Sequence, residues 1–153
     1  MTPMYVFRRV IEREGLGGTF LVGRDAIACP ANDSRIHFPA IVSSSEVRDW
    51  EGVDRYWHDD AQRLSVDLAL NVIPTILRKR GAQAWFTFNP VESTDWVWQR
   101  FVVHPRPGDL IRKVSWRDNP YQNPQNEAER IAMRREDPAL YRHVWEGELD
   151  PRV

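Results

Sequence analysis

Two short aromatic runs, each followed directly by polar residues, most constrain what this chain can fold into. Residues 53–58, Val-Asp-Arg-Tyr-Trp-His, lead straight into two adjacent carboxylates, Asp59 and Asp60. Residues 84–88, Ala-Trp-Phe-Thr-Phe, lead into Asn89 and a proline. Aromatic and β-branched residues favour strands, and a proline ends a strand because it cannot donate to the ladder. The pattern predicts two strands that each present polar side chains where they end.

A helix is predicted between these two strands. Ser65 is a suitable N-cap, and from Val66 to about Lys79 apolar residues recur at helical spacing, namely Ala69, Val72, Ile73 and Ile76. Pro74 should bend this helix, because a proline cannot donate the hydrogen bond to the carbonyl four residues earlier. The order strand, helix, strand predicts parallel strands joined by a helical crossover, so that their polar ends meet at one edge of the sheet.

The remaining segments are predicted from the same signals. An amphipathic helix from Val6 to Glu14 has an apolar face formed by Phe7, Val10 and Ile11. Short apolar runs separated by turn formers then predict a small antiparallel meander with strands at 19–22, 26–29 and 35–41. The other predicted elements are a polar connection at 43–45, a helical turn at 46–51, a helix at 95–103, a third strand at 110–116, a helix at 127–136 capped by Asn126, and a helix restarting at Pro138.

Length and composition narrow the class of protein. A chain of 153 residues is one domain or part of one, and the element order makes it an α/β domain. The net charge of −1, from 21 basic and 22 acidic residues, provides no general attraction for nucleic acid or an anionic membrane. The seven Trp residues are expected mainly in the core, and Cys29, the single cysteine, excludes an internal disulfide. With no signal peptide and no apolar run long enough for a membrane span, we expect a soluble, intracellular protein.

The acid pair has two possible uses. In nucleotide hydrolysis, a first acid at a strand end holds magnesium through its water shell, and a second orients and deprotonates the attacking water. The polar tip of the neighbouring strand then senses the γ-phosphate. An acid pair at a strand end also serves simply as negative charge at the N-terminus of the next helix. Taken by themselves, Asp59 and Asp60 leave both interpretations open.

Other polar groups are weaker candidates. The glycines of residues 15–18 are not followed by Gly-x-x-x-x-Gly-Lys-Ser/Thr, so they predict no phosphate loop. The four histidines show no metal-ligand spacing and are expected at the surface or in hydrogen bonds. Arg130, Arg134 and Arg135 are interspersed with acids, which favours a solvated helix face.

A longer set of motifs resembles the large terminase subunit of tailed phages, in the group found in defective prophages. The resemblance covers roughly residues 35–148 and rests on separated stretches in family order, at 51–54, 57–62, 73–76, 85–90, 117–120 and 137–148. The last of these reads Asp-Pro-Ala-Leu-Tyr-Arg-His-Val-Trp-Glu-Gly-Glu. The family is a P-loop motor ATPase fused to a nuclease, and it pumps phage DNA into an empty capsid.

The resemblance implies roles for the residues at the two strand ends. Asp59 resembles the Walker B acid that holds Mg²⁺, and Asp60 lies where the catalytic Glu normally stands. Thr87, Phe88 and Asn89 match the coupling motif that links hydrolysis to movement of DNA. Aspartate is one methylene shorter than Glu, which places the carboxylate about 1.5 Å short of the water, and misplacements of that size cost on the order of a hundredfold in rate.

The polarity of the first strand is a further departure from the family pattern. Arg55 and His58 make this strand unusually polar for a Walker B strand.

The resemblance also implies what these residues lack. Residues 1–150 correspond to an incomplete ATPase domain, with part of a P-loop (ASCE-type) sheet, parallel strands, helical crossovers and the small antiparallel meander. The Walker A loop lies upstream of the matched region and the nuclease domain beyond it, so ATP binding by these residues alone should be weak or absent.

The partners that the resemblance implies are double-stranded phage DNA, the small terminase subunit, the portal and a separately encoded N-terminal half. No membrane is among them, and the implied location is the cytoplasm of a bacterial host. The cofactors implied are ATP and Mg²⁺. Whether this stretch is an active enzyme stays open at this point, because an interaction module docking on packaging proteins and a non-functional prophage remnant fit the same residues.

Overall fold

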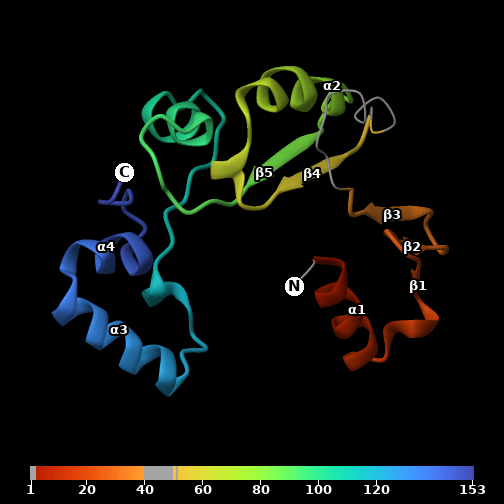
Figure 1. The fold of residues 1–153 in the computed structure, drawn as a ribbon. Helices are drawn as coiled ribbons and strands as arrows, with labels where there is room; N and C mark the ends of the chain where they lie inside the picture. The colour runs from red at the N-terminus through yellow and green to blue at the C-terminus, as the bar shows by residue number, and fades with distance from the viewer. Residues whose placement is uncertain (1–2, 40–49, 51) are drawn as a thin grey trace. The chain divides into compact units, whose positions relative to one another are not determined.

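The computed structural model describes residues 3–39, 50 and 52–153. The chain divides into two compact units, Met1–Val42 and Ser43–Val153, which are considered separately (Figure 1). Together they form a mixed α/β structure with one antiparallel and one parallel sheet. The predicted connection at 43–45 and the helical turn at 46–51 lie outside the described residues, apart from Trp50.

The first unit is a helix packed on the predicted meander. Helix α1, Pro3–Arg13, is followed by a turn at Gly15, whose φ of 67° suits glycine, and then by a 3₁₀ turn, η1, Leu16–Gly18. Strands β1, Leu21–Val22, β2, Ala26–Cys29, and β3, Ser34–His37, pair antiparallel in the order β1-β2-β3. The meander is therefore confirmed, with first and third strands shorter than predicted.

The predicted apolar face of α1 is wrong at one position, Val10. The core consists of Met4, Ile11 and Ile27, with Phe7 packed against it, whereas Val10 is 40% exposed. Met4, Phe7 and Ile11 follow one another by three and four positions and so share one stripe. Val10 lies at the edge of that stripe, where the helix turns away from the sheet.

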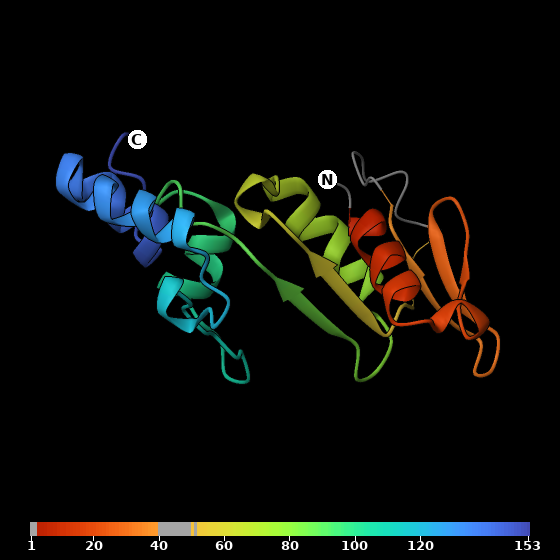
Figure 2. The same cartoon turned by 90° about the horizontal axis from the view of Figure 1, so that it is seen from below.

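The second unit contains the two predicted parallel strands. Strand β4, Arg55–His58, pairs with β5, Gln83–Phe86, in a register that places Trp57 opposite Trp85. The pairing continues past both strands, because Thr87 N–H donates to His58 O at 3.1 Å and Ala61 N–H donates to Thr87 O at 3.0 Å. Figure 2 shows the two strands side by side and pointing the same way. The carboxyl ends of β4 and β5 therefore meet, as predicted.

The crossover helix contains a widened turn in front of its proline. Residues 66–76 are helical, with a π-helical turn, η4, Leu68–Val72, leading into α2, Ile73–Ile76. Leu68 N–H donates to Ser65 Oγ at 3.2 Å, which confirms the predicted N-cap. A π turn uses bonds to the fifth residue back, and it accommodates Pro74 at the place where the sequence predicted a bend. The helix ends at Ile76, three residues before the predicted end.

The core of the second unit lies between this helix and one face of the sheet. Leu64, Ala69 and Ile73 are buried together there, and the half-buried Tyr56 and Phe86 of the strands pack against them. A 3₁₀ turn, η3, Ala61–Arg63, connects β4 to the helix. The predicted helix at 95–103 is confirmed over residues 96–103, and most of it is π-helical, η5, Trp98–Val103.

The predicted third strand at 110–116 is wrong. Residues 110–115 pair with no strand among the described residues, and Leu110 is 97% exposed. An apolar run becomes a strand only where a neighbouring strand accepts its backbone groups. The run instead leads to Ser115, which caps a 3₁₀ turn, η6, Trp116–Asp118.

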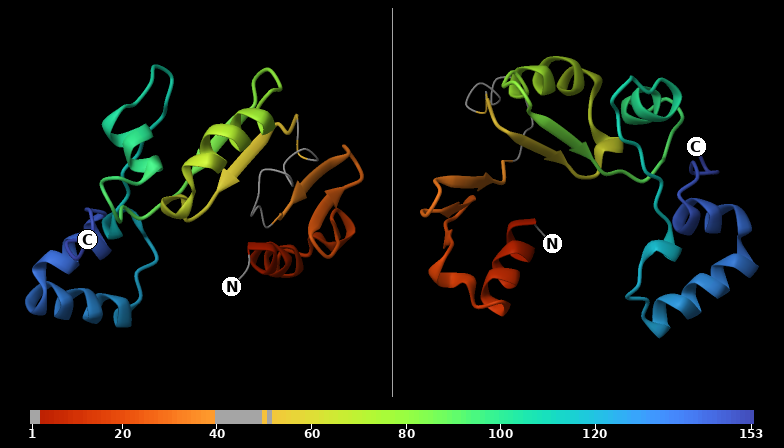
Figure 3. Two further views of the ribbon diagram at one scale, coloured as in Figure 1. Left: turned by 45° about the horizontal axis from the view of Figure 1, so that its top comes forward. Right: turned by 180° about the vertical axis from the view of Figure 1, so that it is seen from behind.

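Two helices end the second unit, joined by a short turn that Figure 3 shows. Helix α3 spans Pro124–Glu136, and its N-cap is Asn123, because Asn123 Oδ1 accepts the N–H of Asn126 at 2.7 Å. The prediction of Asn126 as the cap is therefore wrong by three residues. The helix begins earlier because Pro124 is well suited to the first helical position. Helix α4, Pro138–Glu146, restarts as predicted and is capped by Asp137. In the described part of the chain, no helix is long and apolar enough to cross a bilayer.

Candidate functional site

The two faces of the β4–β5 sheet have different environments. Tyr56, His58 and Phe86 are half-buried on the face that the crossover helix covers. On the other face Trp57 and Trp85 lie opposite one another and remain 55% and 52% exposed. Parallel sheets are normally covered on both faces. The expectation that the tryptophans lie mainly in the core is wrong for this pair, and the sheet has one open face.

Asp59 and Thr87 are in direct contact at the end of this open face. Thr87 Oγ1 donates to Asp59 Oδ1 at 2.6 Å, across a sequence separation of 28 residues. Thr87 Oγ1 also accepts the indole N–H of Trp57 at 3.0 Å. The three residues form what we call the open site. Side chains alternate along a strand, so residues 57 and 59 of one strand share a face with residues 85 and 87 of the other.

Asp60 points to a different set of neighbours. Its φ of 53° is left-handed, a conformation that aspartate tolerates better than most residues. Its Oδ1 lies 3.4 Å from Gln62 Nε2, and its carbonyl accepts the N–H of Arg63 at 3.0 Å. Gln62 Oε1 is buried without a hydrogen-bond partner in the described structure. The structure thus joins Asp59 to Thr87 and leaves the neighbouring acid outside that contact.

The rest of the predicted coupling motif has no polar contact with the acids. Phe88 is half-buried, and Asn89 is exposed. Within the described residues the Asn89 side chain makes no hydrogen bond to either carboxylate. Only the first residue of the motif, Thr87, therefore reaches the acid pair.

The open site offers oxygen ligands, which is the kind that Mg²⁺ prefers. In the described part of the chain, no cluster of three or more His, Cys, Asp or Glu side chains could hold a metal ion by itself. Mg²⁺ in nucleotide sites is typically bound by one or two carboxylates, with waters and substrate phosphates completing its shell. Asp59 fits such a shared site, since its second oxygen, Oδ2, makes no hydrogen bond within the described residues.

His58 lies on the covered face behind the acids. Burial lowers the pKa of His58, while the charges of Asp59 and Asp60 act in the opposite direction. Tyr56 Oη lies 2.7 Å from His58 Nδ1, and burial raises the pKa of Tyr56 to about 12. The lowered pKa of His58 favours the neutral imidazole, which keeps positive charge away from the acids. The expectation of a hydrogen-bonded histidine is confirmed here.

A second polar cluster joins η6, α3 and α4. The Arg130 guanidinium lies 3.8 Å from the Trp116 ring centroid and 2.6 Å from Glu127 Oε1. Tyr141 Oη donates to Glu146 Oε1 at 2.9 Å, and the Trp116 indole donates to the same oxygen at 3.2 Å. We call these five residues the closed cluster. Arg130 is only 7% exposed, so its predicted place on a solvated helix face is wrong.

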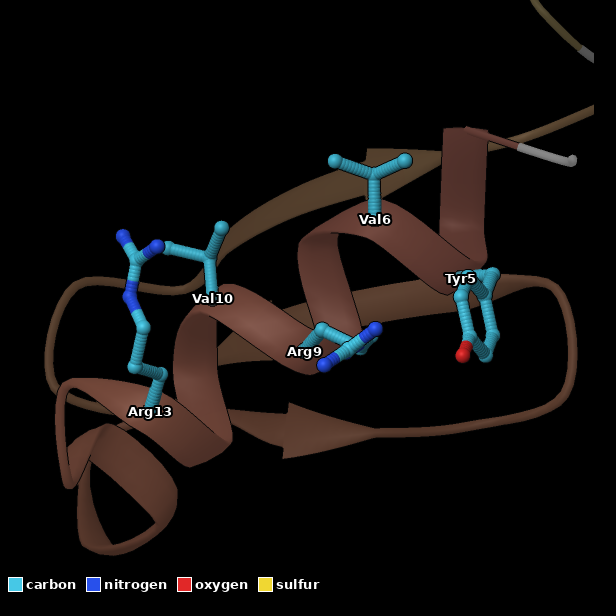
Figure 4. A pocket seen from close by; sticks show the side chains of 5 residues that line it. All are labelled: Tyr5, Val6, Arg9, Val10 and Arg13. Atoms are coloured by element: carbon cyan, nitrogen blue, oxygen red, sulfur yellow. The ribbon is translucent and has the colours of Figure 1, made fainter.

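A hollow lies elsewhere, along helix α1. Figure 4 shows that its lining side chains all come from this one helix, namely Tyr5, Val6, Arg9, Val10 and Arg13. It contains no acid, whereas the predicted acids belong to the second unit. The hollow is therefore separate from the open site.

The sequence prediction missed one member of the open site. Trp57 was assigned only to a strand, and its hydrogen bond to Thr87 was not foreseen. The alternation of side chains places Trp57 and Asp59 on the same face, which was a usable signal. What the alternation could not supply is the register that brings Thr87 between them.

Comparison with known protein families identifies the family to which the chain is similar. Residues 5–148 match a family model described as phage terminase large subunit, which covers nearly the whole chain. No curated protein matches the chain.

Proposed function

Because the chain belongs to the phage terminase large-subunit family, we propose that it contributes the Walker B and coupling-motif half of a DNA-packaging motor ATPase. The observation that carries this proposal is the 2.6 Å hydrogen bond between Thr87 and Asp59. It joins the first residue of the proposed coupling motif to the proposed metal-holding acid. A residue that senses the γ-phosphate must touch the metal side of the site if it is to relay hydrolysis.

The proposed division of labour follows from the contacts. Asp59 would hold Mg²⁺, and Thr87 fixes the orientation of the Asp59 carboxylate. Asp60, at the adjacent position, is the group that takes a proton from the attacking water. Bound Mg²⁺ supplies charge neutralisation for the phosphates. Phe88 and Asn89 continue the strand end toward the part of the motor that moves DNA.

Hydrolysis also requires a loop that holds the phosphates. The 153 residues contain no Gly-x-x-x-x-Gly-Lys-Ser/Thr. Without its backbone amides and lysine, two carboxylates would face a polyanionic nucleotide with little to offset the repulsion. We propose that this loop comes from residues outside this sequence, either in a longer polypeptide or in a separate chain, and that these residues are inactive alone.

The open face of the sheet supports such an assembly. Trp57 and Trp85 leave apolar surface exposed on a sheet type that is normally covered on both sides. We propose that the phosphate-loop half of the motor packs here. The further partners proposed from the family are double-stranded DNA, the small terminase subunit and the portal.

The test is reconstitution of ATPase activity from two polypeptides. The 153-residue chain is mixed with a phosphate-loop polypeptide from the same phage, and phosphate release is measured with and without Mg²⁺. Activity is expected only in the mixture with Mg²⁺, and Asp59→Ala should lower it at least about a hundredfold. Asp67→Ala, an exposed acid on the crossover helix, is the matched control and should retain the activity.

Two outcomes would count against the proposal. Activity that survives Asp59→Ala would remove this acid from the metal site. A mixture that forms a stable complex but hydrolyses no ATP would instead identify the chain as an interaction module.

A further inference from the structure

Two hydrogen bonds link an exposed tryptophan to the acid of the open site. The Trp57 indole donates to Thr87 Oγ1 at 3.0 Å, and Thr87 Oγ1 donates to Asp59 Oδ1 at 2.6 Å. We propose that Trp57 is a positioning residue, which holds the Thr87 hydroxyl so that it stays directed at Asp59. The claim that Trp57 holds Thr87 rests on these two bonds alone. The claim that this matters for catalysis rests on the proposed function.

The chemistry of the three groups fixes the direction of the bonds. An indole N–H can only donate, an ionised carboxylate can only accept, and a hydroxyl can do both. Thr87 is therefore the only member that can stand between the other two. A rotation of its side chain would break both bonds at once. A hydroxyl that accepts one hydrogen bond also donates a second more strongly, because the bonds polarise one another.

Trp57 therefore acts on Asp59 through the Thr87 hydroxyl. Threonine has only a few staggered side-chain positions, and an indole lodged against its oxygen selects one of them. Without that contact, the hydroxyl is free to turn toward water and leave Asp59. The carboxylate would then lose the contact that fixes its orientation.

Trp85 provides a comparison within the same face. It lies opposite Trp57 in the register and is exposed to nearly the same extent, 52% against 55%. Its indole donates no hydrogen bond within the described part of the chain. The two residues thus offer the same kind of apolar surface, and only one of them is connected to the site.

The position of Trp57 also connects the open face to the acid. A partner that covers this face removes water from the Trp57 indole and its bond to Thr87. Hydrogen bonds are electrostatically stronger where the local dielectric is low. Docking of the other half on this face would therefore tighten the orientation of Asp59, so that assembly and alignment of the site are coupled.

The first experiment tests the bonds in the 153-residue chain itself. The indole N–H signals are recorded by ¹H–¹⁵N NMR, and the Trp57 signal is assigned by its loss in Trp57→Phe. Thr87→Val should shift that signal and speed its exchange with solvent by roughly fivefold to tenfold. Thr87→Ser, which keeps the hydroxyl, should restore slow exchange. A Trp57 signal that is indifferent to Thr87→Val would overturn the inference.

The second experiment separates positioning from docking in the reconstituted mixture. At saturating phosphate-loop polypeptide, Trp57→Phe should lower kcat roughly fivefold to tenfold and leave KM for ATP within about twofold. Trp85→Phe should weaken assembly about as much as Trp57→Phe does, but it should lower kcat by no more than about twofold. Equal losses of kcat in the two variants would show that Trp57 contributes only through packing, and would contradict the positioning role.

The two proposals fail in different ways. Activity that persists in Asp59→Ala contradicts the proposed function, and the NMR result still decides whether Trp57 holds Thr87. Loss of activity in Asp59→Ala, together with unchanged kcat in Trp57→Phe, contradicts the positioning role alone.

Discussion

In both the open site and the closed cluster a tryptophan is linked to a carboxylate by hydrogen bonds, through Thr87 in the first and directly in the second, and the surroundings of the two differ. In the open site Trp57 is 55% exposed, and a single hydroxyl joins it to Asp59. In the closed cluster Arg130 and Tyr141 are 7% and 6% exposed. There Glu146 accepts from the Trp116 indole and from Tyr141, and it pairs with Arg117.

The difference separates a stabilising role from a functional one. Removing one partner from a buried, fully paired cluster leaves the other charge without compensation, so such clusters fix structure. An exposed carboxylate with one free oxygen costs little to remove and remains available to a ligand. We therefore expect substitutions in the closed cluster to change stability, and substitutions in the open site to change activity.

The largest expected effect is on activity, at Asp60. Asp60→Glu supplies the methylene that separates this chain from the family pattern, and it should raise kcat of the reconstituted ATPase by up to about a hundredfold. The same change should cost about 1 kcal/mol of unfolding free energy, because Glu tolerates a left-handed backbone less well than Asp. Phosphate release and urea unfolding measure the two effects.

Asp33→Glu is the control for the backbone cost. Asp33 has the same φ of 53° in the first unit, far in sequence from the acids. It should show a similar loss of stability with no gain in rate. If Asp60→Glu lowers kcat, Asp60 is not the group that approaches the water.

The next largest effect is on stability, at the centre of the closed cluster. Arg130→Met keeps a long side chain but leaves Glu127 without its cation, and it should lower Tm by roughly 5–10 °C. Arg135→Met, at an exposed arginine on the same helix, should lower Tm by no more than about 2 °C. Thermal melting followed by circular dichroism measures both. Equal shifts would mean that burial of Arg130 contributes nothing.

The smallest effect concerns the acid dependence of stability. The Arg117 guanidinium, with Tyr141 and Trp116, lowers the pKa of Glu146 from its ordinary 4.5 to about 2. A lowered pKa means that the ionised form stabilises the folded state. This contribution is complete above about pH 4.5 and is lost as pH falls toward about 2.

Comparison of the wild type with Glu146→Gln isolates this contribution. Denaturant unfolding is measured at several pH values, and the difference in stability between the two proteins should shrink as the solution is acidified through that window. Glu129→Gln, on an exposed face of α3, controls for the loss of one surface charge. A difference that stays constant with pH would show that Glu146 is not held ionised by the cluster.

The predictions made from sequence were most accurate for local features. Ser65 was placed at a helix start because a cap bonds to amides two or three residues away. The antiparallel meander followed from turn residues between short apolar runs. The predictions failed where the outcome depends on a distant partner, as at 110–115, which is extended but has no strand beside it in the described structure.

The open site was predicted in part. Asp59 and Thr87 were both named, and their meeting was expected from parallel strands. The hydrogen bond from Trp57 and the separation of Asp60 from that contact were not foreseen. Both depend on the register of β4 against β5 and on the left-handed turn at Asp60.

The sequence by itself determined the Ser65 cap of the crossover helix, the alternation of exposed and covered side chains, and the motifs that identify the family. Those features involve residues close together in the chain, or residue types in a fixed order. Only the tertiary structure decided that Thr87 lies between Trp57 and Asp59, and that Arg130 is buried against Trp116. The physical reason is that strand register and burial are set by contacts summed over distant segments, and no single stretch of sequence contains them.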